Sequence, residues 1–258
     1  MHFVLLRGLA REAGHWLEFP AQLRQQLCQA LGTECEVHCI DFPGCGEYHQ
    51  ETALTSVSAM TDHARTELHV HLGQPLSESI GAPVYLLGIS MGGMVALDWV
   101  QRFPQEIQGL VLINSSTGNQ PFWWRLRPGA WFTMLLALTL PLRQREALVL
   151  RKVSNQLADY QQRLQQWLAI QQQRPVSRDT IITMLQAAAS FIPQISHFPQ
   201  GLILASKQDR LVSIRASEAL AQRFQWPLCI HPTAGHDLPM DDSHWVVQQI
   251  TQWLQKAP

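Results

Sequence analysis

Six short apolar runs recur along the chain, each bounded by glycine, proline or a polar residue. They span residues 3–6, 35–40, 84–87, 110–113, 202–205 and 228–231. Most are rich in valine, isoleucine and leucine, and they lack the strict alternation of apolar and polar positions that marks a half-exposed strand. The pattern therefore predicts six strands of a sheet that is covered on both faces.

Longer segments with helical periodicity separate most of these runs. The clearest are residues 17–31, 90–103, 214–224 and 243–255. In the last of them, apolar residues repeat at the spacing of one helix face, namely Val246, Ile250, Trp253 and Leu254. Strands that alternate with helices are typical of a doubly wound α/β fold, so we expect a mostly parallel sheet of about six strands.

The alternation is interrupted in the second half of the chain. An apolar stretch at 130–142 is followed by apolar residues at helical spacing opposite a glutamine-rich face: Val153, Leu157, Tyr160, Leu164 and Trp167. These five residues predict one long amphipathic helix. A further helix is expected at 179–191, with Ser177 or Asp179 as its N-cap.

This all-helical span predicts how the chain is organised. Residues 1–118 and 199–258 would form the α/β core, and residues 119–198 would form a helical lid over the strand ends. The alternative is that these helices simply extend the core.

The composition limits the kinds of binding partner and the location that we expect for the protein. Among 258 residues the net charge is −1, which offers no field to attract nucleic acid or an anionic membrane. Five cysteines, an odd number without zinc-ligand grouping, indicate reduced thiols. The apolar stretch at 130–142 contains Pro141 and is shorter than the about 20 residues that span a bilayer. We expect a soluble, cytoplasmic protein without a signal peptide or membrane insertion; the oligomeric state stays open.

The sharpest chemical signal is the sequence Gly88-Ile89-Ser90-Met91-Gly92, which lies between a predicted strand and a predicted helix. A serine on such a tight turn presents its hydroxyl beside a helix N-terminus, and the flanking glycines let the chain pass close by. The backbone N–H of Met91 then points toward developing negative charge. We predict Ser90 as a nucleophile and Met91 as an oxyanion donor.

A serine hydroxyl needs a base and an acid that orients it. His236 lies in a glycine-flanked loop after the last predicted strand, and Asp209 follows the fifth. The carboxyl ends of parallel strands share one edge of the sheet, so both side chains are expected beside Ser90. Asp209 would accept a hydrogen bond from His236 and fix its tautomer.

A second oxyanion donor is expected after the first strand. The sequence there is Arg7-Gly8-Leu9, and the backbone N–H of Leu9 is the candidate. Arg7 either pairs with an acid such as Glu12, which we favour, or reaches an anionic group on the substrate.

Taken together, these segments resemble the α/β-hydrolase superfamily. The resemblance extends from about residue 3 to 254 and rests on five features: Asp41-Phe42-Pro43-Gly44-x-Gly46, the Ser90 turn, Phe103-Pro104 through Ile113, Asp209, and Ala234-Gly235-His236. It implies an α/β-hydrolase fold whose usual first two strands are missing, and a compact esterase or lipase with a helical lid. The family commonly has His-Gly where this chain has Arg7-Gly8, which makes the placement of Leu9 less secure than that of Met91.

Other features carry less weight. His15, Trp123 and Trp124 are candidates for binding substrate, although each could equally pack between lid and core. His63, His69 and His71 are close in sequence, but no carboxylates complete a metal site, and we expect surface helix residues. No metal and no organic cofactor are expected.

The sequence therefore predicts a serine hydrolase that cleaves a carboxylic ester of a small to medium, largely uncharged acyl group through an acyl-enzyme. The same three side chains also serve thioesterases, acyltransferases and C–C bond hydrolases. Outside enzymes, the alternative is a ligand-binding protein on a hydrolase scaffold.

Overall fold

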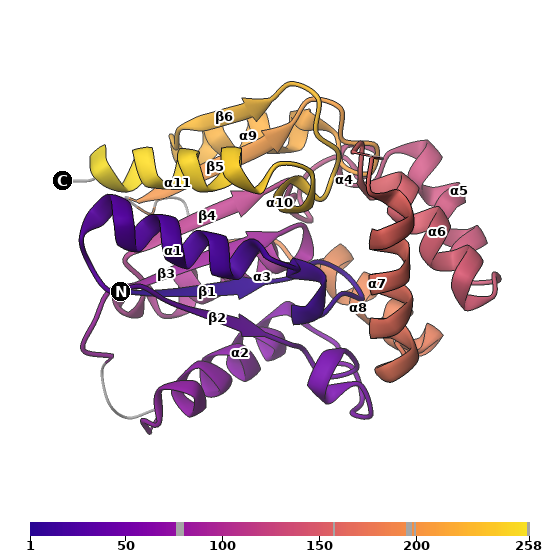
Figure 1. The fold of residues 1–258 in the computed structure, drawn as a ribbon, viewed down its shortest axis with the longest axis horizontal. Coiled ribbons are helices and arrows are strands. Elements are labelled where there is room, and N and C mark those ends of the chain that lie inside the picture. The colour runs from indigo at the N-terminus through magenta and orange to yellow at the C-terminus, as the bar shows by residue number, and fades with distance from the viewer. Residues whose placement is uncertain (76–79, 157, 195–197, 199, 257–258) are drawn as a thin grey trace.

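Six parallel strands form one sheet at the centre of the protein (Figure 1). The structure is a computed structural model and describes residues 1–75, 80–156, 158–194, 198 and 200–256. The strand order is β2-β1-β3-β4-β5-β6. The strands are β1 (His2–Leu6), β2 (Glu36–Ile40), β3 (Val84–Ile89), β4 (Gly109–Ile113), β5 (Gly201–Ser206) and β6 (Leu228–His231). The predicted doubly wound α/β fold of six strands is confirmed, and the sheet is parallel throughout.

Helices cover both faces of the sheet (Figure 1). The helices α1 (Phe19–Leu31) and α11 (Ser243–Lys256) pack on one face, and their apolar residues join a core cluster with Phe3 and Leu5 of β1. The opposite face carries three helices, α2 (Val57–Leu72), α3 (Met91–Arg102) and α9 (Ile214–Phe224). Strands β3 and β4 are buried along their whole length, as their unbroken apolar sequences require.

The segment in which strands and helices stop alternating is helical, as predicted. Between β4 and β5 the chain forms α4 (Phe122–Arg125), α5 (Pro128–Ala137), α6 (Leu142–Val153), α7 (Tyr160–Gln173) and α8 (Arg178–Ser190). Figure 1 shows α5 to α8 beyond the carboxyl ends of the strands. Helix α8 also contributes Met184 and Ala187 to the main core cluster. The division into a core of 1–118 and 199–258 and a lid of 119–198 stays a prediction, and residue 199 lies outside the described part of the chain.

Two sequence predictions need correction. The single amphipathic helix expected from Val153 to Trp167 is two helices, because α6 ends at Val153 and α7 begins at Tyr160; Leu157 lies outside the described residues. His69 was expected on the surface but is buried, because its position on α2 turns inward beside Leu68. The N-cap of α8 is Ser177, whose side chain accepts a hydrogen bond from the N–H of Thr180 at 3.0 Å.

Four short helices complete the fold in the described part of the chain: the 3₁₀ turns η1 (Ala13–Trp16), η2 (Gly46–Tyr48) and η3 (Pro104–Glu106), and α10 (Leu238–Asp241). Within the described residues, none of the helices combines the length and apolar character needed to cross a bilayer.

Candidate active site

Ser90 lies on a strained turn between β3 and α3. Its backbone has φ 56° and ψ −120°, a conformation that costs free energy and persists only where neighbours impose it. The N–H of Ser90 donates to the carbonyl of Ile113 at 2.9 Å, and the Ser90 carbonyl accepts from the hydroxyl of Ser115 at 2.8 Å. These bonds to the end of β4 hold the turn, so the hydroxyl of Ser90 is presented at the carboxyl edge of the sheet.

Glycine is required on both sides of this turn. A Cβ at Gly88 would lie 2.4 Å from the carbonyl oxygen of Gly92, and a Cβ at Gly92 would lie 2.1 Å from the carbonyl oxygen of Leu6. Both distances are shorter than van der Waals contact and involve backbone atoms that cannot rotate away. The glycine spacing that predicted the turn is therefore a steric requirement of this packing.

His236 and Asp209 meet at the same edge of the sheet. Nδ1 of His236 lies 2.7 Å from Oδ2 of Asp209, and both side chains are buried. The other carboxylate oxygen, Oδ1, accepts hydrogen bonds from the N–H groups of Leu211 at 2.7 Å and Val212 at 3.0 Å. The carboxylate is thus fixed from both sides, and its bond to Nδ1–H leaves Nε2 of His236 as the free base.

The pKa of His236 is raised above its ordinary value of 6.5. Burial alone would lower it, but the charge of Asp209, its hydrogen bond to the ring and the nearby charge of Asp237 together outweigh burial and the opposing charge of Arg7. A carboxylate beside the ring therefore strengthens His236 as a base, because it stabilises the imidazolium that forms when the ring takes a proton.

Ser90 and His236 line one cavity, whose volume is about 490 Å³. Within the described part of the chain, no hydrogen bond joins the Ser90 hydroxyl to the imidazole. Bonds of this kind are often long in ligand-free enzymes and tighten when substrate binds. The geometry therefore brings Ser90 and His236 to one cavity, and Asp209 lies behind His236, bonded to its Nδ1.

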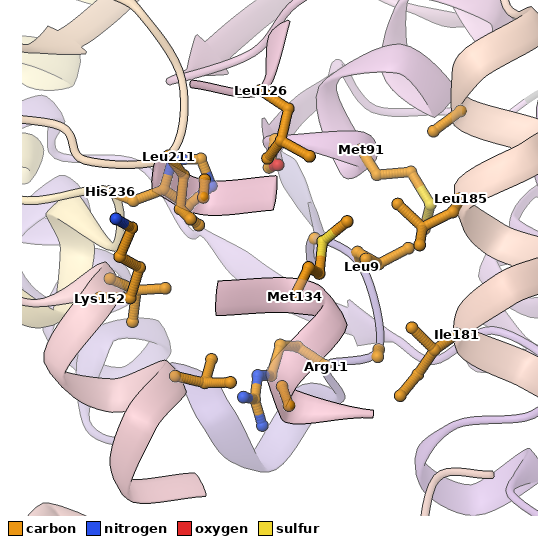
Figure 2. A pocket seen from close by; sticks show the side chains of 18 of the residues that line it. Leu9, Arg11, Met91, Leu126, Met134, Lys152, Ile181, Leu185, Leu211 and His236 are labelled. Atoms are coloured by element: carbon orange, nitrogen blue, oxygen red, sulfur yellow. The ribbon is translucent and has the colours of Figure 1, made fainter. Parts of the chain in front are cut away.

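The two predicted oxyanion donors also border the cavity. Leu9 follows β1 and Met91 is the first residue of α3, and Figure 2 shows both side chains beside the cavity. The N–H of a first helical residue has no partner within its helix, which leaves that of Met91 available. A Cβ at Gly8 would lie 3.1 Å from Cβ of Ser90, so the Leu9 loop passes directly beside the serine.

Asn114 is a positioning residue that the sequence analysis missed. Its side-chain amide donates to the carbonyl of His236 at 2.8 Å, and its side-chain oxygen accepts from the N–H of Ser206 at 2.8 Å. Asn114 thus ties the loop that carries His236 to the end of β5, three residues before Asp209. The available signal was its place directly after a predicted strand, at the same edge as the other site residues.

Arg7 pairs with Asp237, not with Glu12 as the sequence analysis favoured. The guanidinium donates to Asp237 at 2.6 and 3.2 Å, and each side chain is only 4% exposed. The Arg7 guanidinium also stacks over the ring of Trp16 at 4.6 Å. Glu12 instead lies 3.4 Å from Arg174, just beyond α7. Arg7 borders the cavity, but Asp237 neutralises its charge.

We expect Asp237→Asn to lower the free energy of unfolding by about 3–5 kcal/mol, because removal of one partner leaves the other as an unpaired buried charge. The matched control is Asp62→Asn, which breaks an ion pair with Arg102 in which Asp62 is 53% exposed. An exposed pair contributes about 0–1 kcal/mol. Urea unfolding of both variants checks this, and equal losses would contradict the importance of the buried pair.

The helical segment between β4 and β5 is hydrogen bonded to the loops that carry Asp209 and His236. The carbonyl of Val153, at the end of α6, accepts from the N–H of Asp237 at 2.9 Å. The carbonyl of Ser154 accepts from Arg210 at 2.6 Å, and the N–H of Asn155 donates to Asp241 at 2.9 Å. Residues 153–155, which we call the α6 anchor, therefore connect α6 to the segments beside Asp209 and His236.

The cavity wall is mainly apolar, although it includes a polar corner and further polar side chains such as Lys152 and Arg125. Figure 2 shows Met134, Leu126, Leu185 and Leu211 around the same space as Leu9 and His236. The corner is formed by Arg11 and Arg145, which donate to the buried carboxylate of Glu146 at 2.7 and 3.1 Å. Most of the surface offered to a ligand suits a hydrocarbon group.

The structure does not place the other candidate substrate residues in this wall. His15 is buried beneath α7, where its ring contacts Trp167 edge-on, and burial holds its pKa well below the ordinary value. Trp123 is half-exposed, and Trp124 lies outside the cavity lining; the neighbouring Phe122 and Trp131 line it instead. His15, Trp123 and Trp124 therefore do not line the cavity, and a role for them in substrate binding stays a prediction.

The fold and the site define an enzyme class that comparison with known proteins bears out. The model described as "Alpha/beta hydrolase family" matches residues 3–249. The chain belongs to the α/β-hydrolase family and is a hydrolase.

The similar proteins with known names share less than a third of their residues with this chain. The chain is 27% identical over 250 residues to a pimeloyl-[acyl-carrier protein] methyl ester esterase of Chromobacterium violaceum. The matched region covers 96% of this chain and 81% of that protein. The solved structure of the esterase RhEst1 from Rhodococcus sp. superposes with a TM-score of 0.78 at 15% identity, over 100% of this chain and 91% of that one. A thermophilic esterase from Thermogutta terrifontis gives 0.72 at 19% identity, over 99% and 90%.

Proposed function

We propose that the chain is a carboxylic ester hydrolase in which Ser90 is the nucleophile, His236 the general base and Asp209 the acid that orients it. The observation that carries this proposal is the 2.7 Å bond between His236 and Asp209 at a cavity edge shared with the strained Ser90 turn. Membership of the α/β-hydrolase family supports the same assignment.

In the first half of the reaction, Nε2 of His236 takes the proton of the Ser90 hydroxyl as the oxygen attacks the ester carbonyl. The resulting oxyanion accepts hydrogen bonds from the N–H groups of Met91 and Leu9, each contributing about 3–4 kcal/mol to transition-state stabilisation. The imidazolium then donates its proton to the departing alcohol, which leaves an acyl group on Ser90.

In the second half, His236 removes a proton from water, and the hydroxide attacks the acyl-enzyme carbonyl. The same two N–H groups hold the second oxyanion. Collapse of this intermediate releases the carboxylic acid and returns the proton to Ser90. The charge of Asp209 stabilises the imidazolium in both halves.

The cavity favours a small to medium, largely uncharged acyl group. Its volume of about 490 Å³ lies in the range of ordinary small-molecule sites, and its lining is mainly apolar. The C. violaceum relative is a methyl ester esterase, which favours an ester with a small alcohol over a C–C bond.

The substrate assignment is tested by comparing kcat/KM for methyl and p-nitrophenyl esters of acyl chains of increasing length, acyl-CoA thioesters and a β-diketone. We expect esters to be cleaved fastest, with an optimum at intermediate chain length. Faster cleavage of the thioester or of the C–C bond would overturn the ester assignment, although it would leave the nucleophile in place.

We expect kcat/KM to fall on the acid side of an apparent pKa above 6.5, because His236 must be neutral to act as base and its pKa is raised by Asp209 and Asp237. Activity is therefore retained above this pKa and lost as pH falls through it. A pH–rate profile with p-nitrophenyl butyrate measures this acid limb, the range in which kcat/KM falls with pH.

The control is Glu12→Gln. Burial raises the pKa of the Glu12 carboxyl to about 7, so this group titrates in the same range. The acid limb is expected to persist in Glu12→Gln. Its disappearance would assign the limb to Glu12 and contradict the role given to His236.

A further inference from the structure

A cluster of two histidines and a glutamate lies at the amino ends of β1 and β2, away from the carboxyl edge that carries Ser90. Nδ1 of His2 lies 3.1 Å from Nε2 of His38, and Oε2 of Glu36 lies 3.4 Å from the first nitrogen and 3.7 Å from the second. The three donor atoms therefore converge on one point.

The strand register brings these residues together. His2 is the parallel partner of Glu36, and His38 is two positions further along β2, so all three side chains leave the same face of the sheet. The two imidazoles are largely buried, with 14% and 10% of their side chains exposed, whereas Glu36 is 60% exposed and adjustable. The cluster therefore combines two imidazole nitrogens held in place by burial with one carboxylate oxygen that is free to move.

These distances match the ligand sphere of a zinc ion. A tetrahedral Zn²⁺ with Zn–N and Zn–O distances of about 2.0–2.2 Å separates its ligand atoms by roughly 3.3–3.6 Å. The observed 3.1, 3.4 and 3.7 Å lie around that range. Three atoms at these separations form one face of a tetrahedron, with the fourth position left for water or another side chain.

The surroundings also suit a cation. The C-terminal end of α2 lies against this face, and its His71 stacks on His38 with ring centroids 5.8 Å apart. A helix C-terminus carries partial negative charge.

We infer that His2, Glu36 and His38 form a zinc site that fastens the start of β1 to β2, with His71 next to the open position. Its donor set, two imidazoles and one carboxylate, favours Zn²⁺, Ni²⁺ or Cu²⁺ over Mg²⁺. Its place at the amino ends of the strands makes it a structural site separate from the cavity.

Without metal, the same geometry permits one imidazole to donate a hydrogen bond to the other. The experiment therefore measures metal directly. The full chain, without a polyhistidine tag, is stripped with EDTA, dialysed against Zn²⁺ and then against buffer, and its zinc content is determined. We expect one zinc per chain, two imidazole ligands by X-ray absorption, and a Tm that rises with Zn²⁺ concentration but not with Mg²⁺.

The variants His2→Gln and Glu36→Gln are expected to weaken zinc binding by at least the roughly 10- to 100-fold that loss of an outer-shell partner causes. Both must keep the wild-type Tm in EDTA, which shows that they fold. The matched control is His244→Gln, which removes an exposed histidine from α11 and should bind zinc as the wild type does. Absence of retained zinc, or equal retention in all variants, would show that the two imidazoles merely hydrogen bond.

Discussion

Replacing Ser90 by alanine is expected to lower kcat for p-nitrophenyl butyrate by about 10⁶-fold, the loss seen when a serine hydrolase is deprived of its nucleophile. The Tm should stay unchanged, because the Ser90 hydroxyl makes no hydrogen bond within the described residues. The bonds that hold the turn come from its backbone N–H and carbonyl, and alanine keeps both. Steady-state kinetics and thermal unfolding of the same sample measure the two effects.

The residual rate should still exceed that of the uncatalysed reaction, because Met91 and Leu9 remain to bind the oxyanion. A fluorophosphonate should label the wild type on Ser90 and leave Ser90→Ala unlabelled. Ser116, another serine of the cavity wall, supplies the comparison, and Ser116→Ala should retain most of the activity. Loss of labelling in Ser116→Ala, with turnover retained in Ser90→Ala, would reassign the nucleophile.

Replacing Asp209 by asparagine is expected to lower kcat by about 10⁴-fold, as the equivalent change does in serine proteases. The structure gives the reason. Oδ1 accepts from two backbone N–H groups, so the amide oxygen of an asparagine must stay there and its NH₂ must face His236. A donor at that position selects the tautomer with the proton on Nε2, which cannot act as base.

Asp209→Asn should also lower the pKa of His236, because the charge of Asp209 helps to hold that pKa up. Titration of the imidazole by NMR measures this shift. The chain contains a matched control in His231 and Asp242, which lie 3.2 Å apart outside the cavity lining. Asp242→Asn should leave kcat nearly unchanged. Equal effects of the two substitutions would contradict the role of Asp209.

The strands could be predicted from the sequence because each is set by its own apolar run. The run 228–231 coincides with β6, and the run 84–87 lengthens by two residues into β3. The elements between β4 and β5 were harder, because tertiary contacts interrupt the periodicity. Ser154 ends α6 where its hydroxyl donates to Asp241, 87 positions away, so the helical pattern from Val153 onward does not continue.

The same contrast between local sequence and tertiary contacts explains which site residues could be predicted. Ser90, Asp209 and His236 could be proposed because each follows a strand of a parallel sheet, and the topology alone brings such positions to one edge. The partner of Arg7 could not be found in this way. Asp237 is 230 positions away, and nothing in the local sequence distinguishes it from Glu12, which is nearby in the chain.

The α6 anchor has a consequence for engineering this enzyme. Because residues 153–155 hydrogen bond to the neighbours of both Asp209 and His236, the helices between β4 and β5 also help to hold these two side chains in place. A shortened protein in which α4 to α8 are replaced by a simple loop would therefore lose support for Asp209 and His236 along with much of its cavity wall. Exchange of these helices between relatives should succeed best where residues 153–155 of the host are kept.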